Sequence, residues 1–125
     1  MRRLSLALAL LAGCGGEAAP GGAAAVPDGN RVLVEVLNGS GRRGLARAAT
    51  RVLRQAGFDV VYFGTVAQTG ARTQALARRG DSAAAARVAR ALGASVVRVA
   101  TDTLLRLDVT VILGDDYRPP PGLRP

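Results

Sequence analysis

The chain has 125 residues, which is enough for one small domain. It carries 17 basic residues, all of them arginine, against 9 acidic ones, and the arginines are scattered along the sequence. Proteins that bind nucleic acids usually gather basic charge on a recognisable module, so we expect no nucleic-acid partner. The chain has no histidine and one cysteine, which excludes Ser–His and Cys–His nucleophilic pairs and the usual zinc ligands. We therefore expect no catalytic residues, no metal and no cofactor.

The amino-terminal segment predicts export from the cytoplasm. Two arginines precede an apolar run from Leu4 to Leu11, and small residues lead to the single cysteine, Cys14. These are the parts of a secretory signal peptide, and the apolar run is too short to span a membrane. The Leu-Ala-Gly-Cys ending resembles the lipobox of bacterial lipoproteins. The resemblance implies that residues 1–13 are removed and that Cys14 carries lipid, palmitate included, although a chance cysteine after an ordinary signal peptide is an alternative.

A flexible tether and then a folded domain are expected after the cysteine. Residues 14–30 are rich in Gly, Ala and Pro and have no sustained periodicity, as in a linker. From Arg31 a β-branched run, apolar on both faces, predicts a central strand that stops at a glycine-rich turn after Leu37. A single apolar stripe from Leu45 then predicts a helix, which Gly57 ends. The next strand, over residues 58–64, completes a β-α-β unit.

The second half of the chain repeats this order. Asp81 is a favourable N-cap for a second helix, which Gly93 ends. Strands are predicted over residues 95–99 and 107–113, whereas residues 73–78 form a doubtful strand because Gln-Ala-Leu-Ala has weak strand propensity. We therefore predict an α/β fold of the α+β sandwich type. Two β-α-β halves form one mixed sheet of four or five strands, with two helices packed on one face.

Several segments resemble the LytR C-terminal domain family, a module that follows the catalytic domain in many LytR-CpsA-Psr proteins of cell-wall assembly. The most specific is Val-Leu-Asn-Gly-Ser-Gly at residues 36–41, and others are residues 53–61 and 107–117. The resemblance covers nearly all of residues 31–117 and leaves residues 118–125 as a Pro-rich tail. It implies an envelope-associated α/β module without established chemistry. Relatives are more apolar at residues 73–78, which adds to the doubt about that strand.

The turn between the first strand and the first helix is the candidate ligand site. Free backbone N–H groups and the helix dipole attract anions there, and two arginines expected in the first helical turn add charge-assisted donors. The candidate anion-binding residues are Asn38, Gly39, Ser40, Gly41, Arg42 and Arg43. The plainer alternative is a tight turn in which Asn38 or Ser40 caps the helix. A nucleotide site is a third possibility, because the GxGxxG spacing is present. The acidic residue that follows the second strand in such sites is missing here.

Three aspartates are the remaining chemical candidates. Asp108 lies near the start of the last predicted strand, and Asp115 and Asp116 follow its end. Paired carboxylates could serve acid–base chemistry or bind Ca²⁺. Adjacent residues at a strand end point to opposite sides, so we expect a solvated strand end instead.

These observations together predict a non-catalytic, lipid-anchored protein of the cell envelope that faces the periplasm or the exterior. Its expected partners are the membrane, through Cys14, and peptidoglycan, another anionic glycopolymer or an envelope protein. One alternative is a hydrolase or transferase that acts on phosphate-bearing envelope glycans. Another is a purely structural module whose sheet edge pairs with a partner strand.

Overall fold

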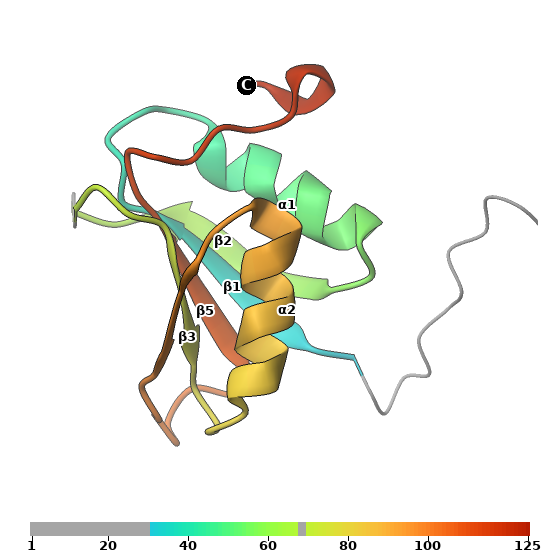
Figure 1. Ribbon diagram of the computed structural model, residues 1–125, viewed down its shortest axis with the longest axis vertical. Coiled ribbons are helices and arrows are strands. Elements are labelled where there is room, and N and C mark those ends of the chain that lie inside the picture. Colours follow the sequence, from blue (N-terminus) through green and yellow to red (C-terminus); the bar gives the residue numbers. More distant parts are fainter. Residues whose placement is uncertain (1–30, 68–69) are drawn as a thin grey trace, which may run out of the picture.

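The computed structural model describes residues 31–67 and 70–125 (Figure 1). Its five strands form one mixed sheet in the order β2-β1-β5-β3-β4, and its two helices lie on one face of that sheet (Figure 1). The predicted fold class is therefore confirmed. The signal peptide, Cys14 and the tether predicted from the sequence lie outside the described residues.

The first β-α-β unit comprises β1 (Leu33–Asn38), α1 (Leu45–Gln55) and β2 (Asp59–Thr65). Strand β1 pairs in parallel with β2, and Gly57 adopts a left-handed φ of 95° after the helix. A positive φ costs glycine little because glycine has no Cβ, which explains why the helix ends where the sequence predicted.

The second unit comprises β3 (Gln74–Ala77), α2 (Ser82–Leu92) and β4 (Val96–Val99). The Asp81 carboxylate accepts a hydrogen bond of 3.0 Å from the backbone N–H of Ala84, which confirms the predicted N-cap. Gly93 ends the helix with a φ of 72°. The doubtful strand is real, because β3 is hydrogen-bonded to β4 on one side and to β5 on the other. Pairing on both sides outweighs the weak strand propensity of its residues.

Strand β5 (Val109–Leu113) joins the two units into one sheet. It runs parallel to β1 and antiparallel to β3, so the sheet is mixed. After β5 the chain crosses over the amino-terminal end of α1, and its tail forms a short 3-10 turn, η2 (Pro121–Leu123) (Figure 1).

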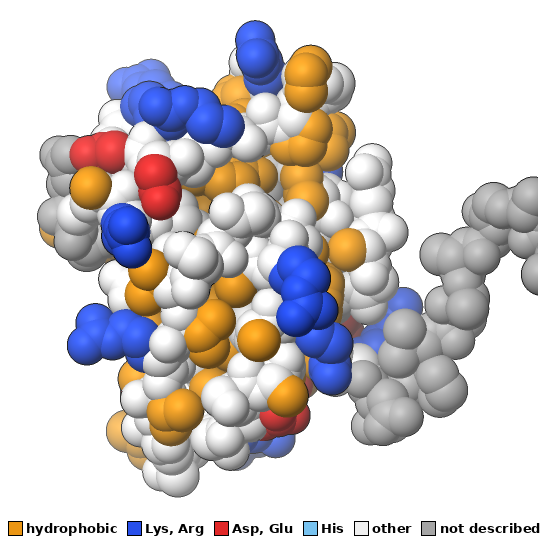
Figure 2. Space-filling view, in the orientation of Figure 1, with side chains coloured by type: hydrophobic (Ala, Val, Ile, Leu, Met, Phe, Trp, Pro, Cys, Tyr) orange, Lys and Arg blue, Asp and Glu red, His pale blue; other side chains and the backbone are white. Residues whose placement is uncertain are grey.

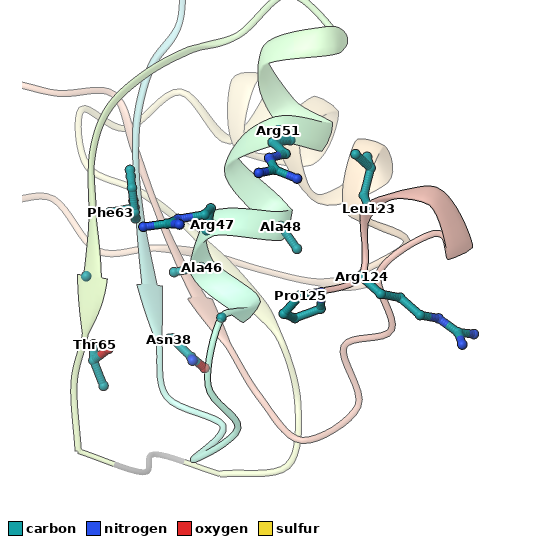
Figure 3. Close-up of a pocket in the computed structure, with 12 residues that line it drawn as sticks. Asn38, Ala46, Arg47, Ala48, Arg51, Phe63, Thr65, Leu123, Arg124 and Pro125 are labelled. Atoms are coloured by element: carbon teal, nitrogen blue, oxygen red, sulfur yellow. The ribbon is translucent and has the colours of Figure 1, made fainter.

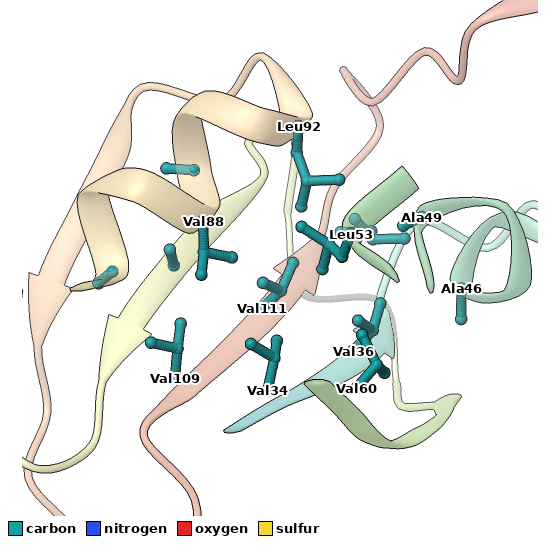
Figure 4. Packing of buried hydrophobic residues seen from close by; sticks show 14 of the residues in the cluster. Val34, Val36, Ala46, Ala49, Leu53, Val60, Val88, Leu92, Val109 and Val111 are labelled. Carbon is teal, nitrogen blue, oxygen red and sulfur yellow. The ribbon is translucent and has the colours of Figure 1, made fainter. Parts of the chain in front are cut away.

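The hydrophobic core lies between the helices and the covered face of the sheet (Figure 4). Leu53 of α1 and Val88 of α2 are both fully buried. Alanines make up much of the remaining helix surface in the core, so the helices lie close to the sheet. The strands contribute Val34, Val36, Val60, Ala75, Ala77, Val109, Val111 and Leu113.

A polar network occupies the opposite face of the sheet, which neither helix covers. The Thr110 hydroxyl is fully buried, accepts a bond of 2.9 Å from Arg78 Nε and donates one of 2.8 Å to Glu35 Oε1. Arg78 Nη1 also donates to the carbonyl of Ala100 at 3.1 Å. A buried hydroxyl without hydrogen-bond partners lowers the stability of the fold, and the Thr110 hydroxyl avoids this because both of its bonds are made. The same chain of bonds links β1, β5 and the ends of β3 and β4.

Candidate functional site

The turn after β1 is held together by its own side chains. Asn38 Oδ1 accepts hydrogen bonds from the Ser40 backbone N–H at 3.0 Å and from the Ser40 hydroxyl at 2.6 Å. Asn38 Nδ2 donates to the carbonyl of Arg42 at 2.6 Å, and Ser40 Oγ accepts from the Arg42 N–H at 3.0 Å. Both side chains are 4% exposed. They therefore shape the loop, and few of their polar atoms remain for a ligand.

Helix α1 begins at Leu45, where its apolar stripe begins, and after the two arginines that were expected in its first turn. Its N-cap is Gly44, at a left-handed φ of 83°, and no side chain caps the first turn. The interpretation that Asn38 or Ser40 caps the helix is therefore wrong, since the loop itself uses both side chains. Arg42 and Arg43 precede the helix and do not lie in its first turn, as had been expected. The amino-terminal end of α1 thus has no side-chain acceptor for its free N–H groups.

The two loop arginines have different roles. Arg42 Nη2 donates to the carbonyl of Tyr117 at 2.8 Å and to that of Asp115 at 3.1 Å, so its guanidinium ties the loop to the segment after β5. Arg43 is exposed, and within the described residues it makes no side-chain hydrogen bond or ion pair. Arg42 acts as a structural clamp, whereas the Arg43 guanidinium is available to a ligand.

A hollow of about 450 Å³, here called the loop–tail hollow, lies between this loop and the carboxy-terminal tail. The structure brings Arg118 and Arg124 of the tail to the two arginines that the sequence singled out. Figure 2 shows basic side chains gathered at this end of the molecule, over the loop and the tail. None of the lining residues is acidic, and they are Arg42, Arg43, Leu45, Arg118, Pro119, Arg124 and Pro125. Sequence reasoning missed Arg118 and Arg124, because no local pattern shows that the tail folds back onto α1.

A second hollow of about 440 Å³, here called the α1–β2 groove, lies among α1, β2 and the end of the tail (Figure 3). Arg47 and Arg51 line it from α1, and Phe63 and Thr65 line it from β2. Asn38 is the one candidate residue from the turn that also lines it, and no lining residue is acidic.

The tail separates the two hollows because it packs against the start of α1. Arg124 and Pro125 line both hollows. A Cβ atom built on Gly44 would lie 2.5 Å from Pro125 Cβ, so only glycine allows this approach. Gly44 thus serves two purposes, since it also adopts the left-handed conformation that precedes the helix.

The three aspartates do not form one acidic patch. Asp108 precedes β5, and its Oδ2 accepts a bond of 2.8 Å from the Leu33 N–H. Asp116 follows β5, and its Oδ1 accepts bonds from the Thr73 N–H at 2.8 Å and the Thr73 hydroxyl at 2.7 Å. These two carboxylates therefore hold neighbouring segments at opposite ends of the strand. Across residues 31–67 and 70–125, no group of three His, Cys, Asp or Glu side chains is placed to hold a metal ion.

Tyr117 is a buried titratable group after β5, and it lines a hollow with Thr73 and Leu92 that is not the loop–tail hollow. It is 3% exposed, and its hydroxyl has no hydrogen-bond partner among the described residues. Burial raises the pKa of the Tyr117 phenol above its ordinary value of 10.0, because the charged form is poorly solvated there. The phenol therefore stays protonated near neutral pH and offers no anionic base or nucleophile.

The sequence from residue 31 to residue 117 matches the family LytR_C, described as LytR cell envelope-related transcriptional attenuator. The chain belongs to the LytR_C family. The resemblance seen in the sequence motifs is thus confirmed for the folded part, and with it a cell-envelope-related context. No curated protein matches this chain.

One solved structure similar to this LytR_C chain is the solution structure of the C-terminal domain of RV0431. It is 28% identical, with 90% of this chain and 96% of that chain covered and a TM-score of 0.47. In the described part of this LytR_C protein, neither helix combines the length and the apolar character that crossing a membrane requires.

Proposed function

We propose that this protein is a non-catalytic lipoprotein of the cell envelope whose LytR_C domain binds an anionic envelope polymer at the loop–tail hollow. Membership in a cell-envelope-related family supports the location. The observation that carries the proposal is the hollow itself, where Arg43, Arg118 and Arg124 join Arg42 without an acidic side chain among the lining residues. Guanidinium groups form charge-assisted bonds with phosphate and carboxylate oxygens, and often do so with two bonds at once.

The small free energy of a single ion pair favours a polymer over a small anion as the ligand of this hollow. An exposed ion pair contributes only about 0–1 kcal/mol, so one anionic group at this open hollow binds weakly. A polymer that repeats its charge engages several arginines together, and the second contact then forms at a high effective concentration. Binding of this kind weakens as salt screens exposed charges.

The lining of the hollow also favours a binder over a hydrolase or transferase. Acid–base chemistry needs a group that accepts a proton within hydrogen-bonding distance of the reacting atom. The hollow has arginine, leucine and proline side chains and no carboxylate or hydroxyl side chain. The Tyr117 phenol does not line this hollow, and it is buried and stays protonated.

Retention on purified cell-wall sacculi tests the polymer-binding step. Arg43→Ala/Arg124→Ala removes two exposed arginines of the hollow that make no side-chain bond within the described residues, and Arg42 is kept because it clamps the loop. We expect retention that salt reverses, and a loss of about tenfold in the double variant, which corresponds to two contacts of about 0.7 kcal/mol each. Arg87→Ala/Arg90→Ala removes the same charge from exposed positions on α2 and should leave retention unchanged. Equal losses in both variants would reduce the effect to net charge, and no retention at any salt would overturn polymer binding.

The anchor has a separate test. Mass spectrometry of the membrane fraction should show a mature protein that begins at Cys14 and carries acyl chains, and Cys14→Ser should release or misprocess it. A soluble protein that keeps Met1 would overturn the lipoprotein part of the proposal. Release of phosphate from any ester by the purified domain, lost in Arg43→Ala/Arg124→Ala, would overturn the non-catalytic part.

A further inference from the structure

The two edges of the sheet differ in length and in what they expose. Strand β2 has seven residues, and within residues 31–67 and 70–125 its ladder partner is β1 alone, so in this part of the chain its outer edge presents backbone N–H and C=O groups that pair with no other strand. Strand β4 forms the other edge, has four residues, and exposes Arg98 together with one apolar residue, Val99. Short and charged edges are the usual protection against pairing with another chain, and β2 lacks that protection beyond Asp59 at its start.

The exposed part of β2 is apolar and aromatic. Val61, Tyr62 and Phe63 are 51%, 56% and 38% exposed. Three consecutive exposed residues of this kind favour strand pairing and are uncommon on an edge that stays free.

The register shows which way these side chains point. The strand bulges where Val34 pairs with Val60 and Glu35 with Tyr62, so Val61 is the extra residue. Beyond the bulge Phe63 pairs with Val36 on the face covered by α1, and it lines the α1–β2 groove. Tyr62 lies on the uncovered face.

The Tyr62 ring is placed along the strand. A Cβ atom on Gly64 would lie 2.7 Å from the Tyr62 hydroxyl, so the ring occupies the space over Gly64. The stretch from Tyr62 to Thr65 is therefore a regular edge with a cationic groove on one side and an aromatic surface on the other.

The positive charge beside β2 indicates which kind of strand can pair with this edge. Arg47 and Arg51 line the groove from exposed positions on α1, and Arg54 of the same helix donates to the Val60 carbonyl at 3.0 Å. A second copy paired through β2 would bring two such rows of arginine to one junction, and like charges at an interface cost several kcal/mol. An acidic strand meets no such cost.

We propose that β2 is an acceptor edge for an extended segment of a partner protein. The segment adds a sixth strand beside Tyr62–Thr65, directs acidic side chains toward Arg47 and Arg51, and directs apolar side chains toward the Tyr62 ring. Main-chain bonds supply affinity and the alternation of side chains supplies specificity, as in other strand-addition complexes. This surface is distinct from the loop–tail hollow, because it requires an open strand edge as well as charge.

Three synthetic octapeptides with blocked ends test the proposal on the ¹⁵N-labelled protein. The first alternates Glu and Val, the second alternates Lys and Val, and the third is the Glu-Val peptide with an N-methyl group on every residue. We expect the Glu-Val peptide to protect backbone N–H groups within residues 61–65 from hydrogen exchange. The Lys-Val peptide should bind at least tenfold more weakly, and the methylated peptide should give no protection because it cannot form the main-chain ladder.

Matched charge reversals identify the groove. Arg47→Glu/Arg51→Glu should reverse the preference so that Lys-Val binds better than Glu-Val, whereas Arg87→Glu/Arg90→Glu on α2 should leave the preference unchanged. Equal binding of the methylated peptide, protection of β4 in place of β2, or peptide-independent dimerisation through β2 would each overturn the proposal. Retention on sacculi, which depends on Arg43 and Arg124, is measured separately, so failure here leaves polymer binding intact.

Discussion

The two β-α-β units have the same order of elements and helices of equal length, yet their helices begin differently. Helix α2 starts at Ser82 and is capped by Asp81, whose carboxylate accepts a hydrogen bond from the first turn. Helix α1 starts at Leu45 after Gly44, and no side chain caps its first turn. The second unit thus satisfies its helix end locally, whereas the first leaves it beside two hollows lined by arginine.

The edge strands of the two units also differ, in length and in the residues that they expose. In the second unit β4 is short, and in the first unit β2 is long and exposes three apolar residues. The second unit therefore has a capped helix and a short edge strand, whereas the first unit has an uncapped helix and a long, exposed edge strand. This asymmetry places both proposed binding surfaces on the first unit and gives the second a supporting role in the core.

Truncation of the core should have the largest effect, and it should be larger in the first unit. Leu53 of α1 is fully buried, and Leu92 of α2 is 9% exposed. We expect Leu53→Ala to lower the free energy of unfolding by about 2–5 kcal/mol through lost burial and a residual cavity. Leu92→Ala should cost less because solvent already reaches that side chain. Urea unfolding curves followed by circular dichroism measure both, and an equal or reversed order would contradict the comparison.

Two left-handed glycines provide the next contrast. Gly44 and Gly93 have φ values of 83° and 72°, and Gly44 alone has a close neighbour, Pro125. Alanine at either position should cost about 1–2 kcal/mol because of the left-handed backbone. Gly44→Ala should in addition displace the tail, so that NMR signals of residues 119–125 shift, whereas Gly93→Ala should leave them unchanged. A tail that stays in place in Gly44→Ala would show that Gly44 does not control its position.

Removal of the cap from α2 should make its helix end resemble that of α1. Asp81→Ala should cost about 1 kcal/mol, because the Ala84 N–H loses its acceptor. Asp81→Asn keeps an oxygen in the same place and should retain most of the stability. A loss in Asp81→Asn as large as in Asp81→Ala would mean that charge, and not the cap hydrogen bond, stabilises the helix.

The smallest effect is expected at Tyr117, which touches both units. Its ring is buried in the core, and its carbonyl accepts the bond from Arg42. Tyr117→Phe removes a buried hydroxyl without a partner, so stability at pH 7 should stay equal or rise by up to about 1 kcal/mol.

The pH dependence of that variant has a definite sign. Because the folded-state pKa of Tyr117 is raised, the neutral phenol favours the folded state, and this contribution is lost as the pH rises above 10.0 through the folded-state pKa. Tyr117→Phe should therefore unfold less readily than the wild type above pH 10.0, as thermal unfolding across the alkaline range will show. Identical alkaline profiles would contradict the assigned burial of the phenol.

Much of the fold followed from local pattern. Gly57 and Gly93 marked the helix ends, and Asp81 marked a helix start, because each of these signals acts within one turn of the chain. The sequence left residues 73–78 open between strand and loop, since they have weak strand propensity and β3 is held by β4 and β5. Only pairing with strands distant in sequence makes Gln74–Ala77 a strand.

The candidate site was predicted in part. The sequence singled out the turn and the arginines after it, but the bonds within the turn commit Asn38 and Ser40 to the loop. The arginines that complete the hollow, Arg118 and Arg124, lie in a tail to which the sequence assigned no role. Lipidation of Cys14 stays a prediction from the sequence.

The sequence by itself determined the order of helices and strands, the family and the absence of histidine and of a second cysteine, all of which depend on residue type and short spacing. Tertiary structure alone decided that β5 lies between the two units, that Arg42 is a clamp and Arg43 is free within the described residues, and that the tail crosses the start of α1. These features depend on contacts between residues far apart in the sequence, such as the two bonds of Arg42, which span 73 and 75 positions. Such contacts form only when hydrophobic burial brings the two β-α-β units onto one sheet, because no local signal in the chain encodes them.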